Sequence, residues 1–588
     1  MRASGSHPAS SDPPAGPRFA LRGRVVTMDA ARTVLDDGVV YVENGLITAV
    51  LPASSPPPAS SADLTAVDTG ATLFPGLIEL HNHLPYNVLP LWQVPKKYGN
   101  RGQWGGSSNP EYHRLVTGPM TVLGQSAELM PAVVRYVEAK ALVNGTTTSQ
   151  GIALFSNAGA RRLYRGVVRT VEATDDPALP EASSRIADVE AVDAQRFLAR
   201  LSQGKRLLLH LAEGVDDAAR EHFLALEYAP GKWAITENLV GIHCTGLHAE
   251  DFTRMADNGA SMVWSPLSNL LLYGGTAKIA AAKKAGLTIG LGSDWSVSGS
   301  KGLLGELKAA RLASTAAGGV FSDVELVAMA TCDAARILRW DHALGTLAAG
   351  FKADITAVKG TSGDAYKTLI DATDQDVAVV VIDGAARYGR TALMKALRPS
   401  AGSALETKVP GIPHTHAVDL VRDDPDPAVG NLLLADAAAI VGKALAALAE
   451  QPHTLMAAVA PMLPAVVAAR RDAAGASAAA DADADADSPT WRLALDEIQP
   501  TGAELRPRLP LFERAGRAAR GRVGLTRPLR AMLSGPPIPR LSANVTHGLS
   551  PVTLDALTAS QNAAFLAELK TETNLPAHYG SQLSDLLD

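Results

Sequence analysis

Two histidines, His81 and His83, close the apolar segment LFPGLIEL. Residues two apart in a β-strand point to the same face, so the two imidazoles project side by side while Asn82 points away. Imidazoles that converge in this way can begin a transition-metal site. Because an H-x-H pair also arises by chance, the rest of the chain has to decide whether these residues bind a metal.

Three further apolar segments end on residues that can bind metals. RLLLHLAEG carries His210 and, three residues later, Glu213; NLVGIHCT ends near His243, and LTIGLGSDWS near Asp294. A single histidine at the end of a strand is usually structural. Five metal-competent residues on four strand ends are hard to produce by accident, and they indicate one site on which four strands converge.

The strands that would position these residues alternate with amphipathic helices. Continuous apolar strands separated by helices are typical of a parallel sheet that is covered on both faces. Seven such strands can be counted, and an eighth is expected in the poorly patterned residues 173–190. The chain is therefore predicted to be an α/β protein with a (β/α)8 TIM barrel, distorted where the eighth strand is short. Such barrels carry their sites at the C-terminal ends of the strands.

Strand patterns also flank the barrel. Residues 19–75 contain a hairpin pattern with an Asn-Gly turn at Asn44–Gly45, and strand character returns in residues 341–398. The two segments are predicted to join as a small β-sandwich domain. The metal-binding barrel, residues 76–340, would then be inserted between the two halves of that domain.

The two ends of the chain differ from the middle in composition. Residues 1–18 are polar and Pro/Ser-rich, which predicts a disordered tail rather than a signal peptide. Residues 399–588 are predicted to be a mainly helical extension with a low-complexity linker near residues 473–489. The eight arginines from Arg506 to Arg530 lack interleaved aromatic residues, so a solvated helical face is favoured over nucleic-acid binding. All candidate ligands precede the extension, which we therefore expect not to be needed for the metal site.

The overall composition narrows the class of protein. A chain of 588 residues, 47% of them hydrophobic, is too long to fold around a single hydrophobic core and should form two or three domains. Its net charge of −6 shows no excess of basic residues that would favour nucleic-acid binding. No uninterrupted apolar run reaches membrane-spanning length, so no membrane association is expected. Two cysteines cannot build a disulfide framework, which fits a reducing cytoplasm. The sequence leaves a homo-oligomer open.

The candidate residues lie in motifs that resemble the metal-dependent amidohydrolase superfamily, over roughly Phe19 to Leu397. PGLIELHNH resembles its first-strand P-G-hydrophobic-hydrophobic-x-x-H-x-H, and HLAE resembles the H-x-x-E of its deaminase branch. IHCT, SPLSN and GSD resemble the motifs of the sixth, seventh and eighth strands of that branch. The pattern is most similar to aminohydrolases of nucleobase-like and triazine rings, such as guanine deaminase and the triazine chlorohydrolases.

The resemblance implies a mononuclear metal centre, because no lysine ends a strand where binuclear members carry a carboxylated one. Its ligands would be His81, His83, His210 and Asp294, and the ion zinc, with iron as the alternative. His243 would polarise the electrophile, Asp294 would accept the proton of the attacking water, and Glu213 would protonate a ring nitrogen.

Substrate recognition is expected in the loop after the first strand, which matches no named deaminase. Trp92 and Trp104 can stack on a planar ring, and Arg101 can hold an acidic group. Asn269, in the seventh-strand motif SPLSN, is a further candidate for substrate binding.

Together these features predict a hydrolase that acts on a non-peptide carbon–nitrogen bond of a small cyclic substrate, by hydrolytic deamination of an aminated heterocycle. The alternatives are a cyclic amide hydrolase similar to imidazolonepropionase and a catalytically inactive scaffold. Ammonia release without ring opening would distinguish deamination from amide hydrolysis. An inactive relative would be expected to lack ligands, and here every expected ligand is present.

Overall fold

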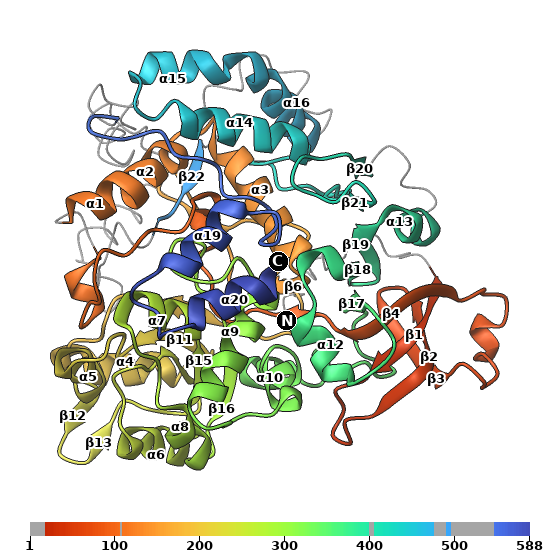
Figure 1. The fold of residues 1–588 in the computed structure, drawn as a ribbon, viewed down its shortest axis with the longest axis horizontal. Helices are drawn as coiled ribbons and strands as arrows, with labels where there is room; N and C mark the ends of the chain where they lie inside the picture. The colour runs from red at the N-terminus through yellow and green to blue at the C-terminus, as the bar shows by residue number, and fades with distance from the viewer. Residues whose placement is uncertain (1–17, 106–108, 399–404, 475–489, 496–545) are drawn as a thin grey trace, which may run out of the picture.

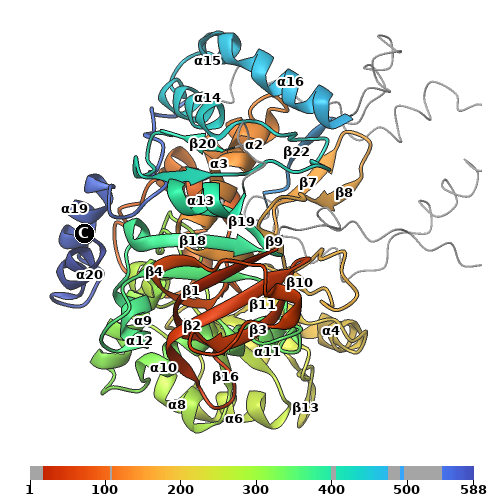
Figure 2. The ribbon, with the colours of Figure 1, turned by 90° about the vertical axis from the view of Figure 1, so that its right-hand side faces the viewer.

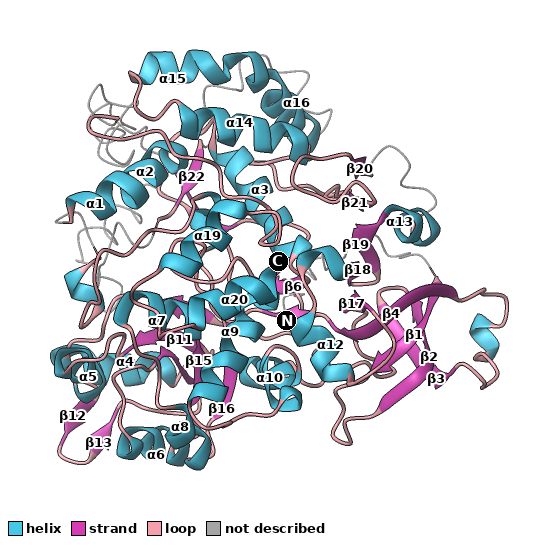
Figure 3. Cartoon of the chain, in the orientation of Figure 1, coloured by secondary structure: helices cyan, strands magenta, loops and turns pink. Residues whose placement is uncertain are grey.

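The computed structural model describes residues 18–105, 109–398, 405–474, 490–495 and 546–588. Figure 1 shows a large, mostly antiparallel sheet at one side, a central body of parallel strands and helices, and further helices above and in front. Figure 3 shows that helices surround the parallel strands of the central body, whereas the outer part of the large sheet carries few of them.

The large sheet, antiparallel except for the parallel pair of β1 and β4, joins the two segments that flank the central body. Its strands, in spatial order, are β20 (Glu406–Thr407), β21 (His416–Val418), β19 (Ala385–Arg390), β18 (Val377–Ile382), β17 (Ile355–Lys359), β4 (Val67–Pro75), β1 (Phe19–Val26), β2 (Val34–Glu43) and β3 (Leu46–Pro52). The junction is the antiparallel pair of β4 and β17, in which Pro75 faces Ile355. Asn44 and Gly45 both have positive φ, 52° and 78°, as the predicted hairpin turn requires.

Two expectations concern this sheet. The sequence predicts a small β-sandwich built from both segments, and the described strands of both segments follow one another in a single hydrogen-bonded order. That order continues past residue 398, where the sequence predicts the end of the domain. β20 and β21 come from the C-terminal extension, and β21 pairs with β19.

The central body contains eight parallel strands in two sheets. One sheet consists of β5 (Leu77–Ile78), β6 (Thr146–Ser149) and β9 (Arg169–Thr170); the other consists of β10 (Ser183–Arg185), β11 (Leu207–Leu211), β14 (Leu239–His243), β15 (Ser261–Trp264) and β16 (Thr288–Leu291). The short β10 lies inside residues 173–190, where the eighth strand is predicted. Its three residues explain why the sequence pattern is weak there.

Backbone hydrogen bonds span both gaps between the two sheets. On one side, the amide of Ala182 donates to the carbonyl of Val171 at 2.8 Å. On the other side, Leu80 donates to Leu291 at 3.1 Å, and the chain then pairs His81 with Asp294. The described strands thus record two parallel sheets in contact, without a closed ring of strand pairs.

Helices and short strands complete the central body. The helices are α1 (Pro110–Tyr112), α2 (Gly118–Gln125), α3 (Met130–Val143), α4 (Ala194–Leu201), α5 (Asp217–Leu224), α6 (Ala249–Asp257), α7 (Pro266–Tyr273), α8 (Ile279–Lys284), α9 (Leu303–Ala316), α10 (Asp323–Met329), α11 (Cys332–Leu338), α12 (Ala365–Asp371) and α13 (Thr391–Leu397). The short strands are β7 (Ala153–Ser156), β8 (Arg161–Leu163), β12 (Glu227–Ala229) and β13 (Lys232–Trp233). α7 follows β15 directly: Pro266 begins it, and Gly274, with φ of 66°, ends it.

The C-terminal extension is spread over the central body. It contains α14 (Leu434–Ala446), α15 (Pro452–Val459), α16 (Leu463–Ala474), β22 (Trp491–Leu493), α19 (Ala563–Thr571) and α20 (Tyr579–Leu587). β22 pairs with β7, and in Figure 2 α19 and α20 form a layer on one flank of the molecule. The arginines from Arg506 to Arg530, nearly all of the predicted linker and residues 1–17 lie outside the described residues.

One helical stretch in the part of the chain that the structure describes, Pro452–Ala473, has the length and composition of a membrane span. Its mean hydropathy is 1.5, and 22% of it is buried. A single such stretch is weak support for membrane insertion, because helices of soluble proteins meet the same criteria. The expectation of no membrane association stays a prediction.

Gly292 is required where β16 meets the first strand. A Cβ atom at this position would lie 2.5 Å from Cβ of His81 and 2.7 Å from its backbone nitrogen, closer than packed atoms approach. We therefore expect Gly292→Ala to lower the free energy of unfolding by ~1–3 kcal/mol and to reduce bound metal. Denaturant unfolding and metal analysis test this.

The matched control is Gly442→Ala in α14, where the nearest atom outside the adjacent turns of that helix, Cδ2 of Leu554, would lie 3.8 Å from an added Cβ. Alanine is favoured over glycine in a helix by about 0.5–1 kcal/mol. This control should leave stability equal or higher and metal content unchanged. Equal effects of the two variants would contradict the packing argument.

Candidate metal centre and active site

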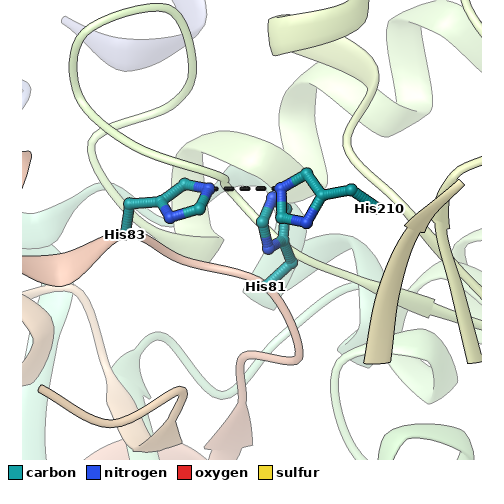
Figure 4. Close-up of side chains that lie close together, drawn as sticks. All are labelled: His81, His83 and His210. Carbon is teal, nitrogen blue, oxygen red and sulfur yellow. Dashed lines mark hydrogen bonds between the residues drawn. The ribbon is translucent and has the colours of Figure 1, made fainter. Parts of the chain in front are cut away.

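The predicted ligands come together at the ends of the parallel strands. Nε2 of His83 lies 3.3 Å from Nε2 of His210, as Figure 4 shows. Oδ1 of Asp294 lies 3.1 Å from Nε2 of His81 and 3.4 Å from Nε2 of His83. His243 joins the same cluster, with its ring 5.1 Å from that of His81. The structure thus brings all five predicted residues together.

In three of the imidazoles, Nδ1, the ring nitrogen that points away from the cluster, contacts a hydrogen-bond acceptor. Nδ1 of His81 lies 3.0 Å from Oε1 of Gln150, and Nδ1 of His210 lies 3.3 Å from the carbonyl oxygen of Arg185. Nδ1 of His243 lies 2.9 Å from Oδ1 of Asn269. Each partner is an acceptor, so Nδ1 carries the proton and Nε2 presents a lone pair to the centre. This is the orientation that metal-binding histidines adopt.

Two site residues have strained backbones. His243 has φ of 66° and Asp294 has φ of 67°, in the left-handed region that residues with a side chain rarely occupy. Such conformations persist only where the surroundings impose them, and they cluster at functional sites. Here the turn after each strand directs the side chain back across the strand ends.

Burial and charge set the protonation states. Burial lowers the pKa of His210 well below its usual value, and the neighbouring imidazoles of His81 and His243 act in the same direction. Burial also lowers the pKa of His243. Burial alone would raise the pKa of Asp294, but its interactions with His81, and then with His243 and His83, outweigh this and hold that pKa below its usual range. The arrangement favours neutral His210 and His243 beside an ionised Asp294 carboxylate.

These donors fit a divalent metal. Nε2 of His81 is buried and has no hydrogen-bond partner, although a buried nitrogen without a partner is costly. A metal ion would satisfy this lone pair together with those of the neighbouring imidazoles and the Asp294 carboxylate. Nitrogen and carboxylate donors suit zinc-like ions, and four of them leave room for a water molecule.

Glu213 lies beside this centre in a separate group of side chains. Its Oε1 accepts a hydrogen bond from the Tyr273 hydroxyl at 2.7 Å, and its Oε2 lies 3.8 Å from Nε2 of His243. Nη1 of Arg101 lies 3.4 Å from the same Oε2. Nε1 of Trp104 donates to the Tyr273 hydroxyl at 2.9 Å. The carboxylate is thus oriented toward the centre without being tied to the histidine ligands.

The four predicted substrate-binding residues lie in different places. Arg101 and Trp104 belong to the group around Glu213. Trp92 is 2% exposed and packs among Tyr98, Trp104 and Tyr112. Asn269 is fully buried and bonds to His243 and Thr276, so it touches the site through His243.

A small cavity of about 60 Å³ opens beside His83 and His210. Glu172 lines it, and its carboxylate accepts from the amide of Gly151 at 2.8 Å and from the hydroxyl of Ser184 at 3.0 Å. Arg185 lines it from β10. Neither residue was predicted from the sequence. Arg185 lies in the poorly patterned residues 173–190, and Glu172 immediately precedes them.

Three further site residues were missed although their motifs were visible. Gln150 ends the TTTS strand, the same position that singled out the histidines. Ser268, in the SPLSN motif, donates to Oδ2 of Asp294 at 2.6 Å. Tyr273, at the end of α7, orients Glu213.

Comparison with known proteins agrees with this geometry. The sequence matches the amidohydrolase family over residues 72–387, more than half of the chain. The chain belongs to the amidohydrolase family. It is therefore a metal-dependent hydrolase of carbon–nitrogen bonds other than peptide bonds, as the sequence predicts, and its cofactor is a divalent metal. The predicted likeness to the deaminase branch is confirmed.

Two curated relatives are the 5-methylthioadenosine/S-adenosylhomocysteine deaminases of Desulfitobacterium hafniense and Symbiobacterium thermophilum. They are 24% and 23% identical to this chain, and each match covers 62% of the chain and 92% of the relative. Among solved structures, a zinc-bound adenosine deaminase from Xanthomonas campestris has a TM-score of 0.49 at 21% identity, covering 64% of this chain and 94% of that one. Guanine deaminase from E. coli has a TM-score of 0.49 at 17% identity, covering 63% and 100%.

Glu306 on α9 has a buried carboxyl group that contacts the start of α7. It predicts a dependence of stability on pH. Its Oε1 accepts from the amide of Leu267 at 3.2 Å, which fixes the start of α7, and burial raises its pKa to about 8. Between pH 4.5, the ordinary value, and pH 8, the folded protein keeps a proton that the unfolded chain releases. The contribution of Glu306 to the free energy of unfolding is therefore fully present at low pH and is lost as the pH rises through about 8.

We expect Glu306→Gln to remove this dependence, since the amide preserves the shape without titrating. The difference in free energy of unfolding between wild type and variant should fall as pH rises, by up to ~1.4 kcal/mol per pH unit. Denaturant titrations across that pH range measure it. Glu250→Gln, at a carboxylate with 60% of its side chain exposed, should show no such slope. A flat difference curve for Glu306→Gln would show that Glu306 is ionised in the folded protein.

Proposed function

We propose that this protein removes an exocyclic amino group from an aminated heterocycle by hydrolysis and releases ammonia. The observation that carries the proposal is the position of Glu213: a buried carboxylate held by Tyr273, with an oxygen within 4.8 Å of donor nitrogens of His210 and His243. A general acid in this position can reach a ring nitrogen of a substrate whose reacting carbon faces the centre. The names of the curated relatives support a purine-containing substrate.

Each residue has a distinct role in this proposal. A bound divalent ion would lower the pKa of a water molecule toward ~7 and so supply the nucleophile. Asp294, whose pKa is depressed, accepts the proton of the attacking water. His243, held by Asn269 with the lone pair of Nε2 facing the centre, accepts a hydrogen bond from the attacking water and so positions it beside the reacting carbon. Glu213 protonates the ring nitrogen, takes the remaining hydroxyl proton as the carbonyl forms and passes it to the leaving amino group, which departs as ammonia. The proton held by Asp294 then restores the protonated form of Glu213.

Residues of the first-strand loop contribute to recognition in this proposal. Arg101 and Trp104 touch Glu213 or its partner Tyr273, so they are the loop residues placed to contact a substrate. Trp92 supports Trp104 from behind, and Asn269 acts by orienting His243. Glu172 and Arg185, on the cavity beside His83, are placed to bind polar groups away from the reacting ring.

We further propose that the two parallel sheets are arcs of one distorted (β/α)8 barrel. The bonds from Leu80 to Leu291 and from Ala182 to Val171 bridge both gaps between them. The donor cluster draws on β11, β14 and the ends of the first and last strands. Such convergence at the carboxyl ends of strands is expected of a barrel site.

A screen of aminated heterocycles, including 5′-methylthioadenosine, adenosine and guanine, tests the proposed reaction by ammonia release. We expect turnover of at least one purine with the ring intact. Glu213→Gln should lower kcat by about 10²–10⁴-fold while the metal stays bound, because the amide keeps the shape but transfers no proton.

Glu250→Gln is the matched control, because Glu250 is a surface carboxylate that pairs with Arg220. It should leave turnover unchanged. Near-normal turnover of Glu213→Gln would rule out the proposed proton transfer. A ring-opened product would instead indicate a cyclic amide hydrolase.

The ligand assignment predicts one metal ion, zinc in the native protein, for each chain. His83→Ala and His210→Ala should both lose the ion, since each removes a donor from the cluster in Figure 4. Asp294→Asn should retain part of it, because a neutral amide is a weaker donor. Elemental analysis of the purified variants measures this.

His416→Ala is the control for losing a buried histidine. His416 stacks on Tyr388 and lies 2.8 Å from the carbonyl oxygen of Val377, away from the cluster. Its loss should reduce stability and leave metal content unchanged. Two equivalents of metal in the wild-type protein would refute the mononuclear centre.

A further inference from the structure

Asp555 lies in residues 546–588, beyond the part of the chain that matches the amidohydrolase family. Its carboxylate is 2% exposed and forms ion pairs with two buried lysines, Lys140 of α3 and Lys301 just before α9. Nζ of Lys301 is 3.0 Å from Oδ2 of Asp555, and Asn562 donates to Oδ1 at 2.8 Å. One carboxylate of the extension thus compensates two buried cations of the central body.

Hydrogen bonds of Lys140 and of the Asp555 backbone connect this ion-pair cluster to the loop that follows the first strand. Nζ of Lys140 donates to the carbonyl of Asn87 at 2.9 Å, and the amide of Asp555 donates to the carbonyl of Val88 at 3.0 Å. The side chain of Asn87 donates to Oδ1 of Asn82 at 2.9 Å. Asn82 is the residue between the ligands His81 and His83.

The same network reaches the other ligand loop. Nζ of Lys301 donates to the carbonyl of Ser296 at 3.0 Å, and the amide of Ser296 donates to Oδ1 of Asn87 at 2.7 Å. Ser296 follows Asp294 by two residues. Asn87 therefore ties the loop of His83 to the loop of Asp294, and Asp555 holds the cations on both sides of it.

Resting on the metal centre of the proposed function, we propose that Asp555 is a positioning residue for that centre. It fixes the two loops that present His83 and Asp294 at the distance the metal requires. Without its charge, two buried ammonium groups would lack compensation, and they would be hydrated only if the loops moved apart. The extension is then a component of the active site, contrary to the expectation from sequence.

Asp374 provides a matched comparison within the same fold. It is also buried, and it holds the same C-terminal segment by accepting from the amides of Ala559 at 2.6 Å and Ser560 at 3.2 Å. Its hydrogen bonds among the described residues run to that segment and not to Asn87 or Ser296. Loss of Asp374 therefore loosens the segment without disturbing the bridge between the ligand loops.

The experiment compares Asp555→Asn with Asp374→Asn in the full-length holoenzyme. Zinc affinity is measured by chelator competition well below the Tm of each variant, and ligand geometry by the visible spectrum of the cobalt-substituted protein. We expect Asp555→Asn to weaken zinc binding by about 10–100-fold and to change the cobalt spectrum. Asp374→Asn should lower Tm with both metal measurements unchanged.

Equal metal affinity and spectrum in Asp555→Asn and wild type would overturn the proposal, as would equal changes in both variants. If Asp555→Asn does not fold, Lys301→Gln is measured in its place. Glutamine can still donate a hydrogen bond to Ser296, but it carries no charge to pair with Asp555. It should shift zinc affinity in the same direction, and an unchanged affinity would overturn the proposal. No substrate enters these measurements, so a failed deamination screen would leave their outcome intact.

Discussion

The convergence of neutral imidazoles on one buried carboxylate is the constraint on which the rest of the site depends. Three histidines turn Nε2 inward because Gln150, Asn269 and the Arg185 carbonyl take up their Nδ1 protons. Burial keeps His210 and His243 uncharged, and the Asp294 carboxylate keeps its charge. Since a buried donor cluster of this kind is unfavourable when left unsatisfied, the fold around it has to be stable enough to hold it.

Part of that requirement is met where the first and last parallel strands meet. The backbone of His83 donates to Asp294 at 2.7 Å, and that of Asp294 donates to His81 at 3.1 Å. Of these residues, Asp294 also carries a strained conformation, which costs of order 1–3 kcal/mol. Gly292 permits the approach because a side chain there would overlap His81. The close backbone pairing of the first and last parallel strands therefore holds Asp294 in its strained conformation.

The sequence could predict which residues gather at the site because each ends an apolar strand, and period-two alternation determines which side chains share a face. It could mark β10 only as an expected strand in a poorly patterned region, since three residues carry too little pattern to define a strand. The motif of Asn269 was visible in the sequence but its contact with His243 was not, because whether an amide faces a substrate or a histidine depends on packing. Asp555 gave no signal at all, because its partners Lys140 and Lys301 lie more than 250 residues earlier in the chain. Long-range charge pairing leaves no local pattern.

In this protein, buried charges of the part that matches the amidohydrolase family are paired with residues of the C-terminal extension. A lysine buried in α3 is tolerable only with a carboxylate beside it, and burial already lowers the pKa of Lys140 to about 8 despite the opposing effect of Asp555. The carboxylate comes from a segment that also reaches α7, where Asn574 donates to the carbonyl of Leu271 at 2.8 Å, and α9, where Tyr579 donates to Ala309 at 2.7 Å. α7 carries Ser268, Asn269 and Tyr273, which orient Asp294, His243 and Glu213. The C-terminal segment therefore contacts α7, α9 and the loops that follow His83 and Asp294. Its removal would expose charges and carbonyls that the central body cannot satisfy alone, so it acts as part of the catalytic unit.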